Sequence, residues 1–196
     1  MIKNLEHKLR FIELLDKMKD IKRIILLRNG GLESDAEHSY HLAMMVLVLA
    51  EDFPELNIEK CLKFALVHDL VEIYAGDTEA LNTEQENTKK QREEDALIEL
   101  EKQYFQVIPE IINLIKEYEL RESKEARFVY SLDKVQPIMQ VVIEGGNAWH
   151  KYKIDFEKIK ARQYSKIYPE FGLGKILDKY FGEAKEKNIY YKEENE

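Results

Sequence analysis

The stretch Leu66-Val67-His68-Asp69-Leu70-Val71-Glu72 places an imidazole and a carboxylate side by side in an apolar run typical of a buried helix. Burying two such hydrated groups without partners costs several kcal/mol, so a compensating partner is needed, and a divalent cation is the strongest candidate. Two more potential ligands stand far away in the sequence, His38 in Glu37-His38-Ser39 and Asp133 in Leu132-Asp133-Lys134. Two imidazoles and two carboxylates form the mixed donor set that suits Mn, Co, Fe, Ni, Zn or Mg.

Outward from this stretch, the chain has the pattern of helices. Apolar residues recur mostly at three- and four-residue spacing, and the 196 residues include only four prolines and eight glycines. This spacing predicts one all-α domain over residues 1–184, followed by a polar tail at 185–196. The expected helices cover about residues 4–19, 35–52, 58–74, 83–105, 109–118, 123–136, 137–149, 156–168 and 174–181.

Capping and turn residues mark several of these boundaries. Ser34 or Asp35 caps the second helix, and the glycines of Asn29-Gly30-Gly31 form a turn before it. Gly76 is expected to be a left-handed cap at the end of the helix that carries the His-Asp pair. Pro137 either kinks the helical pattern or begins a new segment.

Composition and charge exclude several classes of protein. The length allows one domain with a core that needs no disulfide. A net charge of -8 argues against broad nucleic-acid binding, which requires a basic face. The longest apolar stretch, residues 42–50, is far below the roughly 20 residues of a membrane span, and the N-terminus lacks the apolar segment of a signal peptide. The single cysteine, Cys61, fits a reducing compartment, so a cytoplasmic location is expected.

Two further carboxylates stand beside the His-Asp pair. Residues three or four apart share a face of a helix, so Glu72 lies over both His68 and Asp69. An ion at the edge between these two side chains would have Glu72 next to it, where a carboxylate can orient or deprotonate a water that the cation acidifies. Asp77, just past Gly76, is expected to add another carboxylate close to the same ion.

A lone histidine in a helix is more often structural than a ligand, and an isolated His-Asp dipeptide is an equally weak signal. The metal interpretation depends on the conjunction of that pair with its neighbouring carboxylates and with Glu37-His38-Ser39 upstream. His7, His41 and His150 gain nothing from this conjunction. His41, three residues after His38, could support a metal ligand from outside, but ordinary packing or a surface position is favoured, and His150 is interpreted as a helix-end residue. The charges of residues 83–105 are interpreted, for the most part, as a solvated helix face.

The order His38, His68-Asp69, Asp133 resembles the ligand pattern of the HD-domain metal-dependent phosphohydrolases. Three stretches resemble more narrowly the branch with the bacterial 5′-deoxynucleotidases and their eukaryotic relatives: residues 28–39, 68–77 and 128–134. Residues 89–96 are similar to a basic-acidic segment of the same relatives. The resemblance covers about residues 23–149 and leaves both ends of the chain outside it.

The resemblance implies a fold, an activity and a role for each matching residue. An HD-domain fold would bind one divalent ion through His38, His68, Asp69 and Asp133, and would release phosphate from nucleoside 5′-monophosphates. It also implies proton transfer by Glu72 and positioning of the nucleophile or the sugar by Asp77. A homodimer is implied as well, with no nucleic acid or membrane among the partners.

Arg23 matches the arginine that approaches the phosphate in this family, and its guanidinium could bind two phosphate oxygens. A surface arginine on a short helix is an equally acceptable interpretation, and Arg28 is a weaker second candidate. Ile24 departs from the family, whose bacterial members have there an aromatic residue that helps to exclude a 2′-hydroxyl. Discrimination against ribonucleotides is therefore left open.

Other functions remain open at this point. The core motif is shared with mononuclear hydrolases of nucleoside triphosphates or guanosine alarmones, which differ in the pocket wall and in residues 78–87. A non-catalytic nucleotide sensor or a helical interaction module with a structural His-Asp pair are alternatives from other classes. Two-metal members of the superfamily need further histidines, whereas this chain has none between His68 and His150. A single ion of uncertain identity (Co, Mn, Mg, Zn, Ni or Fe) is therefore expected.

Overall fold

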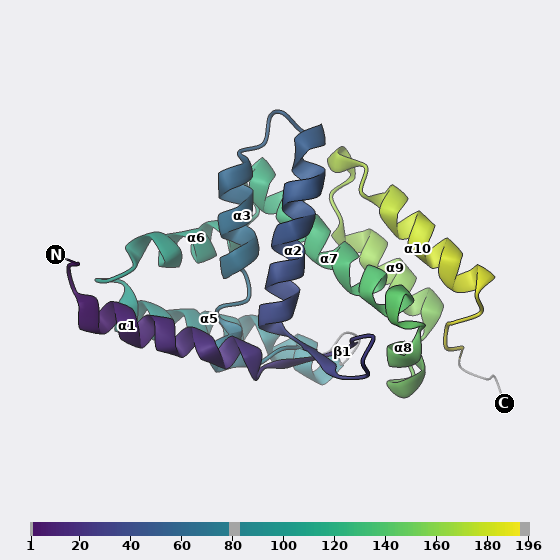
Figure 1. Ribbon diagram of the computed structural model, residues 1–196, viewed down its shortest axis with the longest axis horizontal. Helices are drawn as coiled ribbons and strands as arrows, with labels where there is room; N and C mark the ends of the chain where they lie inside the picture. Colours follow the sequence, from purple (N-terminus) through teal and green to yellow (C-terminus); the bar gives the residue numbers. More distant parts are fainter. Residues whose placement is uncertain (1, 79–82, 193–196) are drawn as a thin grey trace.

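The computed structural model describes residues 2–78 and 83–192, and over these residues the chain is helical apart from a small hairpin (Figure 1). The all-α prediction is confirmed. The helices are α1 (Leu5–Leu14), α2 (Asp35–Leu49), α3 (Ile58–Val67), α4 (Glu72–Ala75), α5 (Thr83–Tyr104), α6 (Pro109–Leu120), α7 (Lys124–Glu144), α8 (Asn147–Lys151), α9 (Phe156–Lys166) and α10 (Gly174–Glu186). Short 3₁₀ turns are η1 (Leu15–Lys19), η2 (Ala50–Asp52) and η3 (Pro169–Phe171).

Polar caps explain why the long helices begin where they do. Ser34 and Glu37 form a capping box at the start of α2, in which each side chain binds the backbone N–H of the other residue. Asn57 and Ser123 cap α3 and α7 by accepting a backbone N–H three residues further on. These caps are local, and this is the reason that the sequence predicts these boundaries well.

The predicted helix over residues 58–74 is wrong in one respect, because the chain leaves the α-helix at the His-Asp pair. α3 ends at Val67 and α4 begins at Glu72. The intervening turn is tighter, with the N–H of Leu70 bonded to the carbonyl of Val67 at 3.1 Å and the N–H of Glu72 to that of Asp69 at 2.9 Å. α4 ends at Gly76, whose φ of 73° is positive but whose ψ of 154° lies outside the left-handed helical region expected there.

Pro137 neither ends a helix nor starts one, because α7 runs continuously from Lys124 to Glu144. A proline has no N–H to bond the carbonyl four residues earlier, which here belongs to Asp133. Gly145 and Gly146, with φ of 95° and 79°, then turn the chain into α8. The predicted helix over residues 137–149 is therefore the second half of α7 followed by the start of α8.

The hairpin is an element that the sequence interpretation did not include. β1 (Lys22–Leu26) pairs antiparallel with β2 (Leu32–Ser34), with Lys22 opposite Ser34 and Leu26 opposite Leu32. The predicted turn at Asn29-Gly30-Gly31 is confirmed, since Gly30 has a φ of 82° and the N–H of Leu27 bonds the carbonyl of Gly31 at 2.8 Å. In Figure 1 the hairpin lies at the foot of α2.

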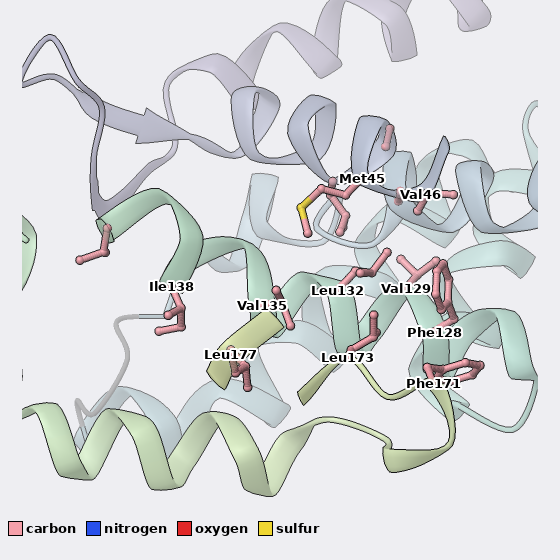
Figure 2. Packing of buried hydrophobic residues seen from close by; sticks show 14 of the residues in the cluster. Met45, Val46, Phe128, Val129, Leu132, Val135, Ile138, Phe171, Leu173 and Leu177 are labelled. Atoms are coloured by element: carbon pink, nitrogen blue, oxygen red, sulfur yellow. The ribbon is translucent and has the colours of Figure 1, made fainter. Parts of the chain in front are cut away.

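The main hydrophobic core lies on both sides of α7. Figure 2 shows Leu132 and Val135 of α7 between Met45 of α2 and Leu177 of α10. Each fully buried side chain of this kind stabilises the fold by roughly 1.5–3 kcal/mol. A second cluster joins α1, α5 and α6. Among the described residues, no helix combines the length and apolarity that crossing a membrane requires.

The described part of the C-terminal segment returns to the body of the molecule. α10 continues past the expected end to Glu186, and Tyr191 then pairs with Asp155 at the start of α9. The division into a domain over residues 1–184 and a tail over 185–196 stays a prediction.

Candidate metal centre

The structure brings together the four predicted metal ligands from α2, from the turn after α3 and from α7. The Nε2 atom of His38 lies 3.1 Å from Oδ1 of Asp133, and Nε2 of His68 lies 3.0 Å from Oδ2 of Asp69. The two cross distances, from His38 to Asp69 and from His68 to Asp133, are 3.9 and 4.0 Å. Donor atoms from three distant parts of the chain therefore lie close together, and those of His38, His68 and Asp69 are all within 4.8 Å of one another.

Both imidazoles are held with Nε2 toward these carboxylates. The Nδ1 atom of His38 lies 2.9 Å from Oε1 of Gln136, and Nδ1 of His68 lies 3.0 Å from the carbonyl oxygen of Ala65. Since each of these oxygens accepts a hydrogen bond, each Nδ1 carries a proton, and Nε2 is the ring nitrogen that is left to bind an ion. Outer contacts of this kind fix the tautomer and the ring orientation of metal-binding histidines.

The spacing of the donors fits a divalent cation. Ligands about 2.1 Å from an ion are about 3.0 Å apart at right angles and about 4.2 Å apart across it. The four distances between an imidazole nitrogen and a carboxylate oxygen lie in this range. Nε2 of His68, moreover, is buried and has no hydrogen-bond partner within the described residues, which is the state of a ligand atom.

The two aspartates of the centre are held as carboxylates. Burial acts to raise the pKa of Asp69, but its contacts with His68 and the charge of Arg23 outweigh burial and lower the pKa below its usual value. Burial likewise opposes ionisation of Asp133, and Lys134, whose Nζ donates to Oδ2 at 2.6 Å, leads the contacts that lower the pKa of Asp133. Metal ligands must be deprotonated, so this electrostatic environment favours binding.

A second group of carboxylates lies beside the first. Asp35, Glu72 and Asp77 each offer one oxygen atom, and these atoms lie within 4.8 Å of one another. Burial, aided by the charge of Asp69, raises the pKa of Asp35 to about 7 and raises the pKa of Glu72 well above its ordinary value. The pair of buried carboxyls is suited to hold or accept a proton near neutral pH.

Arg23 projects from the strand β1 toward these carboxylates. The alternative interpretation, a surface arginine on a short helix, is therefore wrong. Its Nη1 atom lies 3.3 Å from Oδ2 of Asp69, 3.6 Å from Oδ1 of Asp35 and 3.9 Å from Oδ1 of Asp77. Burial opposes its charge, yet the carboxylates outweigh burial and raise its pKa. The other candidate, Arg28, is exposed in the hairpin turn.

A cavity of about 270 Å³ opens onto the centre. Its wall near the donors includes Arg23, His68, Asp69, Glu72 and Asp77. Ile24, the position that departs from the resemblance, also lines the cavity.

Several residues of the site escaped the sequence interpretation. Gln136 binds His38 and donates from Nε2 to Glu33 at 2.8 Å, and the same nitrogen lies 3.1 Å from Nδ1 of His41. His41 therefore reaches the centre through Gln136, which agrees with the less favoured of its two interpretations, support of a ligand from outside. The spacing of Gln136, three residues after Asp133 on one helix face, is the signal that could have revealed it.

The charged segment of α5 also contributes more than a solvated face. Arg92 donates to Oγ1 of Thr78 at 2.7 Å and lies 3.4 Å from the carbonyl oxygen of Gly76, so it binds the residues on both sides of Asp77. Lys89 lines the cavity with its Nζ 4.0 Å from Oε1 of Glu72. Most of the remaining charges of this helix are exposed, as expected.

Comparison with known proteins identifies the family to which this chain belongs. The HD domain family matches residues 15–172, and the chain belongs to that family. Among solved structures, a predicted metal-dependent phosphohydrolase from Magnetospirillum magnetotacticum superposes with a TM-score of 0.78. It is 30% identical, and the match covers 96% of this chain and 98% of that one.

Within this family, the chain is similar in sequence to proteins named as 5′-deoxynucleotidases. The chain is 36% identical over 139 residues to the 5′-deoxynucleotidase HDDC2 of Mus musculus, a match that covers 67% of each protein. It is 30% identical over 138 residues to the 5′-deoxynucleotidase hdd1 of Schizosaccharomyces pombe, covering 67% of this chain and 69% of that protein. About a third of each relative therefore lies outside the match.

Proposed function

We propose that this protein is a metal-dependent phosphohydrolase that removes phosphate from nucleoside 5′-monophosphates. The observation that carries the proposal is the close approach of two Nδ1-anchored imidazoles and two ionised aspartates. The curated names of the sequence relatives, 5′-deoxynucleotidases, supply the substrate class. Neither a purely structural role for the His-Asp pair nor a sensor accounts for the buried carboxyls beside the centre.

The donor set of His38, His68, Asp69 and Asp133 would hold one divalent ion of the group Co, Mn, Mg, Zn, Ni or Fe. Such an ion polarises a phosphate ester and lowers the pKa of water. A single ion is favoured because Arg23 already supplies positive charge to the neighbouring carboxylates Asp35 and Asp77.

The remaining polar residues divide the chemistry between proton transfer and phosphate binding. Glu72, buried and with a raised pKa, would accept the proton of the attacking water. Asp77 would orient that water or the sugar, from a position between two residues that Arg92 binds. Arg23 would bind the phosphate oxygens and stabilise the charge that develops in the transition state.

The test is a phosphate-release assay of the purified protein with ribo- and deoxynucleoside 5′-monophosphates, each in the presence of Co, Mn, Mg or Zn. We expect turnover with at least one of these ions and none in a chelator. Asp69→Ala, prepared in parallel, controls for a contaminating phosphatase. Release of phosphate only from nucleoside triphosphates or from guanosine alarmones would replace the proposed substrate, and release from none of them would favour the sensor.

We also propose a cytoplasmic homodimer that binds no nucleic acid. The buried, unpaired thiol of Cys61 supports a reducing compartment. Tyr40, Met44 and Val48 are exposed and share one face of α2, which supports an interface between two copies. Measurement of the mass in solution by light scattering tests the dimer, and a monomer at micromolar concentration would exclude it.

A further inference from the structure

The cavity extends well beyond the metal centre, along one face of α7. Lys134, Ile138 and Val141 line it and follow each other at four- and three-residue spacing. A helix rises 1.5 Å per residue, so the eight residues from Asp133 to Val141 correspond to about 12 Å. One continuous space therefore connects three of the four donor residues, His68, Asp69 and Asp133, with a region beyond the residues of the proposed chemistry.

The far end of this space has apolar walls. Trp149 of α8 lines it, and so do Ile154 and Ile159 at the start of α9. The indole of Trp149 is only 3% exposed and lies parallel to the ring of Phe181 at 6.3 Å, so its position is fixed by the core. Flat, rigid apolar walls of this kind suit a planar heteroaromatic ring.

Polar residues of α9, namely Arg162, Gln163 and Lys166, also line this end of the cavity. Gln163 of α9 lines the cavity one turn beyond Ile159 and is 4% exposed. Its Oε1 atom is buried and finds no hydrogen-bond donor in the part of the chain that the structure describes. Burying an amide oxygen without a partner destabilises a protein by roughly 1–3 kcal/mol. A buried unpaired acceptor in a cavity wall is explained if a ligand supplies the donor.

We propose that the region around Trp149 and Gln163 is the nucleobase compartment, in which Gln163 accepts a hydrogen bond from an N–H group of the base. The inference rests on the proposed function, which puts the phosphate of the same ligand beside Arg23 and the four donors. Each of the common bases carries such an N–H on its pairing edge, and an amide can also present its NH₂ group when rotated. The protein would therefore recognise the base of its ligand as well as the phosphate.

The kinetic test compares nucleoside 5′-monophosphates with 2-deoxyribose 5-phosphate, which keeps the phosphate and the sugar but lacks the base. The metal-loaded wild type should prefer the nucleotides in kcat/KM. Gln163→Leu should lower kcat/KM for nucleotides about tenfold, the equivalent of roughly 1.4 kcal/mol, mainly through KM. Its kcat/KM for 2-deoxyribose 5-phosphate should stay unchanged. Equal losses on both substrates, or no loss on either, would overturn the assignment.

A stability measurement separates this role from a structural one. Leucine has about the volume of glutamine and no unpaired acceptor, so Gln163→Leu should keep or raise Tm. Gln106→Leu makes the same replacement at an exposed position between α5 and α6, and its kinetics should equal those of the wild type. A fall in Tm of Gln163→Leu together with a general loss of activity would assign Gln163 to the fold instead.

A binding experiment keeps the inference separate from the proposed function. Calorimetric titration of the metal-free protein with 2′-deoxynucleosides, which carry no phosphate, should show binding to the wild type and weaker binding to Gln163→Leu. If no nucleotide is hydrolysed while this difference persists, the activity is wrong and the compartment stands. If nucleotides are hydrolysed and no nucleoside binds, the compartment is wrong.

Discussion

The two ends of the cavity are built in different ways. At the metal end, fixed polar neighbours orient three of the four predicted ligands: Gln136 and the carbonyl of Ala65 hold the imidazoles, and Lys134 holds Asp133. At the other end, Gln163 has a buried amide oxygen without a partner within the described residues, beside the apolar side chains of Trp149 and Ile159. The difference teaches that the geometry of bond cleavage is fixed in advance, whereas the recognition end leaves a group for the ligand to satisfy.

Removal of a ligand should have the largest effect. We expect Asp69→Ala to lose both the metal and the turnover, because Oδ2 of Asp69 lies beside Nε2 of His68 and beside Arg23. Outer partners of a metal cost about 10- to 100-fold in affinity when removed, and a direct ligand should cost more. Elemental analysis after dialysis against the metal measures the occupancy. Asp95→Ala, exposed on α5, is the control, and full occupancy of Asp69→Ala would exclude Asp69 as a ligand.

Loss of the proton acceptor should leave the metal in place. Glu72→Ala should bind metal as the wild type does, while kcat falls by about 10²- to 10⁴-fold, the usual contribution of a general base. The same analysis of metal content and a phosphate-release assay separate the two effects. Glu94→Ala changes an exposed carboxylate of α5 and should have full activity. Unchanged turnover in Glu72→Ala would remove this residue from the mechanism.

Arg23→Ala should weaken stabilisation of the transition state. Removing one donor to a developing oxyanion costs about 10²- to 10³-fold in rate, and we expect a loss of this order in kcat/KM. Steady-state kinetics with a nucleoside 5′-monophosphate provide the measurement. Arg28→Ala, in the exposed hairpin turn, removes the same charge outside the cavity and should leave the kinetics unchanged. Normal kinetics for Arg23→Ala would discard phosphate binding by Arg23.

Gln136→Leu should have the smallest effect at the metal end. This change removes the acceptor for Nδ1 of His38, so the affinity for metal should fall by about 10- to 100-fold. Gln140 lies one turn further along α7 and donates to the carbonyl of Leu26 at 3.0 Å. Gln140→Leu should therefore cost stability of about 1 kcal/mol but no metal affinity. Equal metal affinities in the two variants, measured by calorimetry, would show that Gln136 does not orient His38.

Whether a structural feature could be predicted from the sequence depended on how far apart in the chain the interacting residues lie. The start of α2 at Ser34 and the turn at Gly30 depend on bonds between residues close in the chain, and both were predicted. The break of the helix at His68 was missed, because an apolar run with helical spacing contains no local signal for it. The hairpin was missed for a related reason, since β1 and β2 are short and pair across a turn.

The sequence by itself determined the helical class and the chemical types of the predicted metal donors, since the imidazoles of His38 and His68 and the carboxylates of Asp69 and Asp133 follow from the residues alone. Only the tertiary structure decided which other residues lie around these donors. Gln136 at His38, Arg23 among the carboxylates and Gln163 at the far end of the cavity come from different elements. The physical reason is that burial and hydrogen bonding depend on which surfaces pack together, and packing joins residues that are remote in the chain.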